Sequence, residues 1–320
     1  SPDGDLNIYA RIITDEARRR GVSVEVVDAQ GGFFRLSHGG RSVLCRESLS
    51  ELTNAVAMSL CDDKPATRRL LSSIGLPVPE AVDGDDMDAC KELLARSGSV
   101  VVKPARGEQG RGVAVGITDT DALVSAIEAA RELCPDVLVE QCVQGEDLRV
   151  LVINNEVVAA AIRRRPSILG DGKASIRTLT EGLSRRRAAA SDGEARIPID
   201  RETERCIAAA GYGLDDVLPK NTTLEVRKTA NLHTGGTLHD VTADLSPAII
   251  SAAIKAAEAI RIPVLGLDLM TPDPGGDDFV VIEANERPGL ANHEPQPTAE
   301  KFLDLLFPQT VRPSRQENRP

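Results

Sequence analysis

The chain has 320 residues, a net charge of −11 and a hydrophobic content of 41%, which indicate a globular protein with room for two or three subdomains. Aromatic residues make up 2% and Trp is absent, so we expect neither the basic surface nor the stacking platforms of a nucleic-acid-binding protein. No apolar run approaches the roughly 20 residues of a membrane helix, and no signal-peptide core is seen, so we expect a cytoplasmic protein without a membrane partner.

Residues 1–62 read as a small leading α/β module. The patterns predict, in order, a helix over Leu6 to Arg20, a strand over Val22 to Val27, a hairpin over Phe33 to Cys45 and helical spacing over Ser48 to Cys61. Ser1 stands where an initiating Met is expected. We therefore expect the sequence to be part of a longer protein.

The next helix begins near Lys64, with Pro65 in its first turn and Gly75 after its end. A cation at a helix N-terminus is unfavourable beside the helix dipole unless an anion is present. Lys64 is therefore a candidate phosphate contact, and a solvated lysine is the alternative.

A buried strand over 99–104 is interrupted by Lys103, which is costly to bury unless it is paired with an anion. A glycine-rich loop follows, whose candidate phosphate-contacting residues are Gly107, Gly110, Arg111 and Gly112. Such a loop lets backbone N–H groups approach phosphate oxygens, although a hairpin turn is the alternative. It matches neither a Walker A nor a dinucleotide-binding glycine motif.

Downstream, helical patterns cover 119–133, 200–210 and 246–260, and a hairpin covers 145–162. The strand over 137–143 contains Glu140. A strand that ends at a nucleotide can offer main-chain groups to the base and a carboxylate to the ribose. The candidates for these contacts are Glu140, Gln141, Val143 and Asp147.

Two later strands each present hard oxygen ligands. Asp268 closes the apolar run 262–267, and Glu283 and Asn285 follow the run 279–282 on one face, being two residues apart. Carboxylates combined with nucleotide phosphates suit Mg²⁺. We predict a magnesium-nucleotide site, while polar ends of strands are the alternative.

These segments resemble, in order and spacing, the ATP-grasp carboxylate-amine ligases. The resemblance is carried by Lys64, Lys103 with its loop, VLVEQCVQGEDLRV, Asp268 and EANERPG. The arginine run at 163–165 and the segment 227–237 resemble the ATP-grasp part of the cyanophycin synthetase family. The segment 293–298 adds a resemblance to the N-acetylglutaminylglutamine synthetase family, whose acetyltransferase-like part is absent here.

The resemblance implies an α/β (α+β) ATP-grasp fold, in which two subdomains clasp ATP behind the small leading module. It also implies an enzyme that uses ATP and two Mg²⁺ ions to form an amide or peptide bond through an acyl phosphate. The implied partners are small amino-acid or dipeptide substrates, N-acetylglutamine and glutamine first, on the way to an osmoprotectant. A cyanophycin-synthetase-like or glutathione-synthetase-like ligase, a small-molecule kinase, a catalytically silent nucleotide-binding module and a homo-oligomer stay open.

Some ATP-grasp ligases place an arginine two residues before the metal-binding Asp, where this chain has Gly266. Arg227 and Arg163 are the candidate replacements at the oxyanion, because both follow strand-like runs and are expected to face the centre. Arg287 is a candidate for the substrate carboxylate, and Asn231 belongs to a glycine-containing segment that could form a backbone nest. Surface arginines and a tight turn are the alternatives.

The predicted division is a leading module over 1–62, an ATP-grasp domain over 63–310 and a flexible tail over 311–320. The ATP-grasp domain comprises a nucleotide-covering subdomain over 75–145 and a metal and substrate subdomain over 146–310. ATP is expected to lie between these two subdomains.

Overall fold

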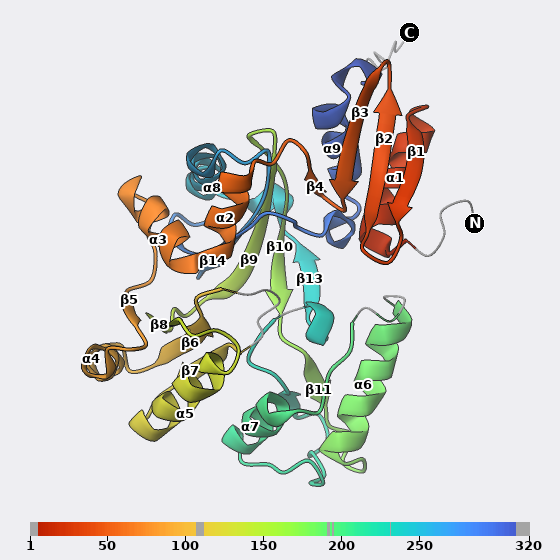
Figure 1. Cartoon of the computed structure of the whole chain (residues 1–320). Coiled ribbons are helices and arrows are strands. Elements are labelled where there is room, and N and C mark those ends of the chain that lie inside the picture. The colour runs from red at the N-terminus through yellow and green to blue at the C-terminus, as the bar shows by residue number, and fades with distance from the viewer. Residues whose placement is uncertain (1–5, 107–111, 191–192, 194, 231, 312–320) are drawn as a thin grey trace.

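The computed structural model describes residues 6–106, 112–190, 193, 195–230 and 232–311. Their strands form antiparallel sheets of four, five, two and four strands (Figure 1). The mixed α/β class predicted from the sequence is confirmed. The predicted tail lies outside the described residues except for Val311.

The leading module is a four-stranded meander packed on two helices. Its elements are α1 (Ile8–Arg19), β1 (Ser23–Asp28), β2 (Phe33–His38), β3 (Arg41–Arg46), β4 (Leu49–Ser50) and, from the other end of the chain, α9 (Thr298–Leu306) with η4 (Pro308–Thr310). Phe34 and Leu36 of β2 and Phe302 and Leu306 of α9 belong to one buried core. The C-terminal helix is thus a structural part of the leading module.

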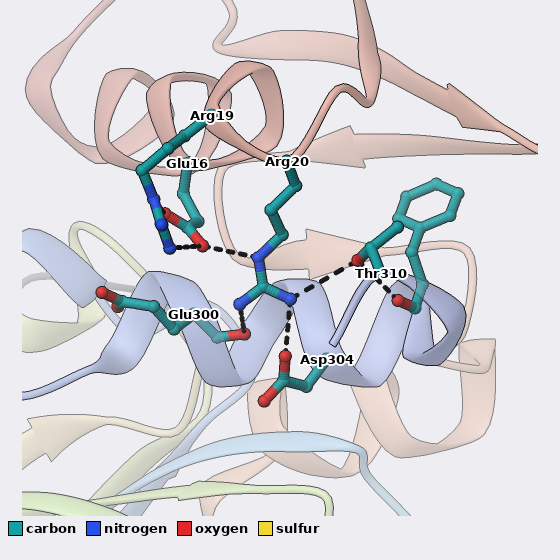
Figure 2. A network of polar contacts seen from close by, with 7 residues as sticks. Glu16, Arg19, Arg20, Glu300, Asp304 and Thr310 are labelled. Atoms are coloured by element: carbon teal, nitrogen blue, oxygen red, sulfur yellow. Dashed lines mark hydrogen bonds and ion pairs between the residues drawn. The ribbon is translucent and has the colours of Figure 1, made fainter. Parts of the chain in front are cut away.

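A buried ion network ties α1 to α9 (Figure 2). The guanidinium of Arg20 lies 2.6 Å from Asp304 and 2.5 Å from Glu16, and it also donates to the carbonyl oxygen of Glu300 at 2.9 Å. The Arg20 side chain is 7% exposed. Two carboxylates and a carbonyl therefore compensate one buried cation.

The central sheet has the order β13-β10-β9-β14-β15. Its strands are β9 (Glu146–Ile153), β10 (Glu156–Arg164), β13 (Thr237–Asp240), β14 (Val264–Thr271) and β15 (Val280–Asn285). Alternate residues of β9 face two cores: Val150 packs with α8 (Pro247–Ile260), and Leu151 packs with the leading module. Because both faces are covered, these strands read as continuous apolar runs.

Two short helices lie on the α8 side of this sheet. They are α2 (Ala55–Asp62) and α3 (Lys64–Ser73). The helical spacing predicted from Ser48 is wrong at its start, because β4 occupies 49–50 and α2 begins only after its N-cap residue, Asn54. The Asn54 side chain accepts a hydrogen bond from the N–H of Ala57, which fixes the first turn.

A covering lobe contains the sheet β5-β8-β6-β7. Its elements are β5 (Ala81–Asp83), α4 (Met87–Ser97), β6 (Val100–Pro104), β7 (Ala114–Ile117), α5 (Thr120–Arg131) and β8 (Val137–Gln141). Leu93, Leu123 and Ile127 from the helices pack with Val102 and Val139 from the strands. Asp119 caps α5, because its side chain accepts a hydrogen bond from the N–H of Ala122.

A further inserted lobe lies between β10 and β13. It contains β11 (Ser167–Leu169), α6 (Ile176–Ala190), α7 (Arg201–Ala209), β12 (Thr223–Glu225) and η1 (Leu232–Thr234). It has its own core, which includes Ile176, Ile207 and Leu218. The remaining short helices are η2 (Thr242–Asp244) and η3 (Leu290–His293). No helix in the described part of the chain is long and apolar enough to cross a membrane.

Candidate functional site

A cavity of about 1020 Å³ lies where the covering lobe, central sheet, inserted lobe and leading module meet. Its lining includes eleven of the residues predicted from the sequence: Lys64, Lys103, Glu140, Gln141, Val143, Asp147, Arg163, Asp268, Glu283, Asn285 and Arg287. Gly107, Gly110, Arg111 and Asn231 lie outside the described residues. Gly112 is described, with φ of +72°, and is not part of the lining.

Lys103 has a buried anionic partner. Antiparallel pairing of β6 with β8 places the two strands side by side, and Lys103 Nζ lies 2.6 Å from Glu140 Oε2, with each side chain 6% exposed. Because a buried ion needs compensation, this pair holds both groups at the cavity lining. The lysine that interrupts the apolar strand therefore has an anionic partner, as expected, but this partner is Glu140, which was predicted to contact the ribose.

Lys64 approaches the same cavity from the start of α3. Its N–H donates to the carbonyl oxygen of Ala105, just after β6, at 3.2 Å, and its Nζ lies 3.3 Å from Glu283 Oε1. Arg106 bridges Asp62 at 3.0 Å and Asp63 at 2.8 Å. These contacts fix the start of α3 against the end of β6, so two lysines distant in sequence reach one cavity.

Asp268 lies inside β14, so the expectation that it ends a strand is wrong. The strand continues to Thr271, and its neighbours in register are Arg149 on β9 and Glu283 on β15. Arg149 forms a two-point ion pair with Asp268, and Arg163 Nη2 lies 2.9 Å from Asp268 Oδ2. The carboxylate is thus held between two guanidinium groups.

The electrostatics of this network follow from burial and from the paired charges. Burial acts to raise the pKa of Asp268, but the charges of Arg149 and Arg163 outweigh it and hold that pKa below its ordinary value. Burial raises the pKa of Asp147, which Arg163 contacts at 2.7 Å. Burial opposes the charge of Arg163, yet Asp268 and Asp147 raise its pKa above the usual value.

Arg149 is a site residue that the sequence analysis missed. It interrupts the apolar strand Leu148 to Ile153 just as Lys103 interrupts 99–104. Arg149 lies beside Gly266, the position where some ATP-grasp ligases have an arginine. A Cβ added at Gly266 would stand 3.3 Å from Arg149 Nη1. The neighbouring strand therefore supplies a guanidinium next to the glycine.

The donor set at the end of β15 fits a hard divalent cation. Asp268 and Glu283 are direct cross-strand neighbours, and Asn285 Nδ2 lies 3.4 Å from Asp268 Oδ2. Two carboxylates and an amide oxygen are suitable Mg²⁺ ligands when phosphates complete the shell. Within the described residues, no three His, Cys, Asp or Glu side chains are grouped to hold a metal.

Arg227 does not face the cavity, contrary to the expectation. Its guanidinium donates to Asp200 and to Thr203 Oγ1, each at 2.8 Å, and it is 7% exposed. Asp200 is the N-cap of α7. The arginine is drawn into the inserted lobe because the cap carboxylate there compensates its buried charge.

The leading module also reaches the cavity, which the sequence analysis did not anticipate. Its contributions are Asn7, Tyr9, Arg46 and Glu47. Glu47 Oε2 lies 3.6 Å from Arg287 Nη1, and the rings of Tyr9 and His233 meet edge to face at 6.3 Å. Residues 1–62 therefore form part of the site as well as a support for it.

One family model and two curated proteins show what the chain resembles in sequence. A RimK-like ATP-grasp domain matches residues 61–227, more than half of the chain. The chain is 32% identical over 322 residues to a cyanophycin synthetase of Trichormus variabilis, covering 96% of this chain and 36% of that protein. It is 27% identical over 305 residues to a glutathione biosynthesis bifunctional protein of Desulfotalea psychrophila, covering 90% and 39%.

The chain thus spans somewhat more than one third of the length of these curated relatives. Among solved structures, it is similar to a bifunctional glutathione synthetase from Pasteurella multocida, with a TM-score of 0.66 and 21% identity over 95% of this chain and 44% of that one. A D-alanine–D-alanine ligase from Bacillus anthracis gives a TM-score of 0.51 and 17% identity over 81% and 70%. These similarities show a shared fold.

Proposed function

Because the chain belongs to the RimK-like ATP-grasp family, we propose that it is an ATP-dependent carboxylate-amine ligase that forms an amide bond through an acyl phosphate. The observation that carries this proposal is that Lys64, Lys103, Asp268, Glu283 and Asn285 all line one cavity. Two cations for phosphates and three oxygen donors for Mg²⁺ meet there although up to 221 positions separate them in a chain of 320 residues. This arrangement matches the needs of phosphoryl transfer, which depends on positioning and charge neutralisation.

In the proposed reaction, Lys64 and Lys103 bind the phosphates of ATP, and the backbone from Gln141 to Val143 receives the base. Asp268, Glu283 and Asn285 would hold two Mg²⁺ ions, which supply further charge neutralisation when bound. The polar lining thus orients ATP with its γ-phosphate toward the central sheet.

The substrate carboxylate oxygen then attacks the γ-phosphorus, the bond to the β-phosphate oxygen breaks, and ADP leaves. The amine nitrogen next attacks the acyl carbon and loses a proton, and phosphate departs as the carbon-nitrogen bond forms. Arg163 and Arg149, both at the cavity lining, are the groups proposed to stabilise the oxyanion. Arg163 was predicted for this role from the sequence, and Arg149 replaces Arg227.

For the substrates, we propose N-acetylglutamine and glutamine, supported by the resemblance of residues 293–298 to that ligase family. The product would be a dipeptide osmoprotectant made in the cytoplasm. We also propose that this chain is the ligase part of a longer protein, since its relatives extend well beyond the matched region.

The test is ADP and phosphate release with Mg-ATP against pairs of carboxylates and amines, with mass spectrometry of the product. ADP release that needs both partners and gives a new amide mass supports the ligase. ADP release without any amine requirement indicates a small-molecule kinase. Nucleotide binding without turnover for any pair would contradict the proposed activity for this chain.

A further inference from the structure

Three consecutive residues after β15 contact the leading module. Arg287 forms an ion pair with Glu47. The residues that follow them are also in contact, because Ser48 Oγ donates a hydrogen bond to the carbonyl oxygen of Pro288 at 2.6 Å. A Cβ added to Gly289 would stand 2.8 Å from Tyr9 Cε1, so the ring lies against that backbone. The loop that follows the candidate metal ligands is therefore seated on residues 1–62.

Glu47 is held in place on two sides. Asn7 Nδ2 donates to Glu47 Oε1 at 2.8 Å, while Asn7 Oδ1 accepts from the N–H of Ala10 and caps α1. The N–H of Glu47 donates to Gly32 at 3.1 Å, and its φ is +51°, a conformation that favours glycine. The carboxylate thus stands in one orientation at the cavity lining.

The Glu47–Arg287 pair is longer than the Lys103–Glu140 pair of the same cavity. Its separation is 3.6 Å, against 2.6 Å for Lys103–Glu140, and its side chains are 16% and 17% exposed, against 6%. Charge-assisted hydrogen bonds are strongest near 2.7–2.9 Å. A carboxylate and a guanidinium thus lie side by side at the cavity lining.

We propose that Glu47 and Arg287 bind a free α-amino acid as the amine donor, which rests on the proposed ligase function. Arg287 binds the α-carboxylate through two parallel hydrogen bonds, and Glu47 accepts hydrogen bonds from the α-ammonium group. Glu47 then takes one proton from that group, which frees the nitrogen lone pair for attack on the acyl carbon. In this proposal the carboxylate held by Arg287 stays free in the product, and the amino acid therefore enters on the amine side. Arg287 follows Asn285 by two residues, which places the subsite next to the candidate phosphate site. The leading module is then a specificity element.

The experiment is isothermal titration calorimetry. Each of the common L-amino acids is titrated into the full chain in the presence of Mg-ADP. The N-acetyl derivative and the α-amide of the tightest ligand are then compared with it. We expect each derivative to bind at least about tenfold more weakly, because each lacks one charge. Glu47→Gln should lower the affinity for the free amino acid about tenfold and leave the affinity for the N-acetyl derivative unchanged. Glu47→Asp should retain part of the affinity for the free amino acid.

Glu25→Gln is the matched control, since Glu25 belongs to the same module and pairs with Arg35 away from the cavity lining. Glu25→Gln should bind the free amino acid with the same affinity as the unchanged chain. The proposal is overturned if no amino acid binds, if N-acetylation has no effect, or if Glu47→Gln binds as the unchanged chain does. Failure of the ligase function would instead appear as absent ADP binding or absent turnover with Glu47 intact.

Discussion

The Lys103–Glu140 pair is a buried ion pair, and Lys103 is also the group that we propose binds phosphate. Lys103→Met leaves Glu140 buried without a partner, so we expect a loss of about 3–5 kcal/mol in the free energy of unfolding and loss of ATP turnover. Lys103→Met combined with Glu140→Gln should recover most of the stability but not the turnover. Urea unfolding and ADP release measure the two effects, and turnover by either variant would contradict the assignment of Lys103 to the phosphates.

His293 is a buried imidazole whose protonation destabilises the fold. Burial first, and then the charge of Arg149, lower its pKa to about 4, although Asp240 and Asp268 act in the opposite direction and Arg163 adds to the lowering. Nδ1 of His293 has no hydrogen-bond partner among the described residues.

Because the folded-state pKa lies below the ordinary value of 6.5, the unfolded chain takes up the proton first as the pH falls. The contribution of His293 is therefore fully present above pH 6.5 and is lost progressively down to about pH 4. The loss is on the order of 3 kcal/mol. Urea unfolding from pH 7 to 4 should show a shallower decline for His293→Gln, and parallel declines would contradict the prediction.

The connection into β9 is an element-scale constraint on the cavity. Gly145 has φ of +144°, and an added Cβ would stand 2.8 Å from the carbonyl oxygen of Thr271 in β14. Gly145→Ala must therefore displace backbone, and we expect a loss of about 1–3 kcal/mol in stability. Gly213→Ala is the control, since its nearest atom, in the Asp216 side chain, would lie at 3.6 Å. Equal melting temperatures for the two variants would contradict the prediction, because they would show that the backbone at Gly145 accommodates a Cβ without loss of stability.

Elements with strong local signals were predictable from the sequence. Helices α5, α7 and α8 begin after Asp119, Asp200 and Ser246, whose side chains accept the N–H of the third helical residue. Such capping is decided within one turn of the chain. The two-residue strand β4 has no local signal, because a bridge that short depends on its partner strand β3.

Site residues were predictable where a local sequence pattern marked them, as the helix start marked Lys64. Lys103 was marked by its interruption of an apolar run, and Arg149 could have been found by the same argument. The Arg149–Asp268 pair depends on the register of β9 with β14, which joins residues 119 positions apart. Arg227 was misplaced because a strand pattern does not reveal that a distant helix cap, Asp200, competes for its charge.

On the scale of the whole molecule, the leading module is completed by the far end of the chain. Arg20 on one side and Asp304 on the other carry the buried ion network of Figure 2. Arg20→Met leaves Asp304 without its cation and Glu16 paired with Arg19 alone, so we expect a loss of about 3 kcal/mol in the free energy of unfolding. Arg18→Met on the same helix, where the pair with Asp15 is 3.6 Å long and more exposed, should change stability by less than about 0.5 kcal/mol. Similar urea midpoints for the two variants would refute the importance of the network.

The contact between α1 and α9 also decides how the chain carries tension. A stretching force applied at Leu6 and Val311, the first and last described residues, loads this helix pair before it reaches the central sheet or the covering lobe. The helix pair of the leading module is then the first part of the structure to resist the force. We expect the central sheet and the covering lobe to carry load only after the contacts of Arg20 and Phe302 rupture.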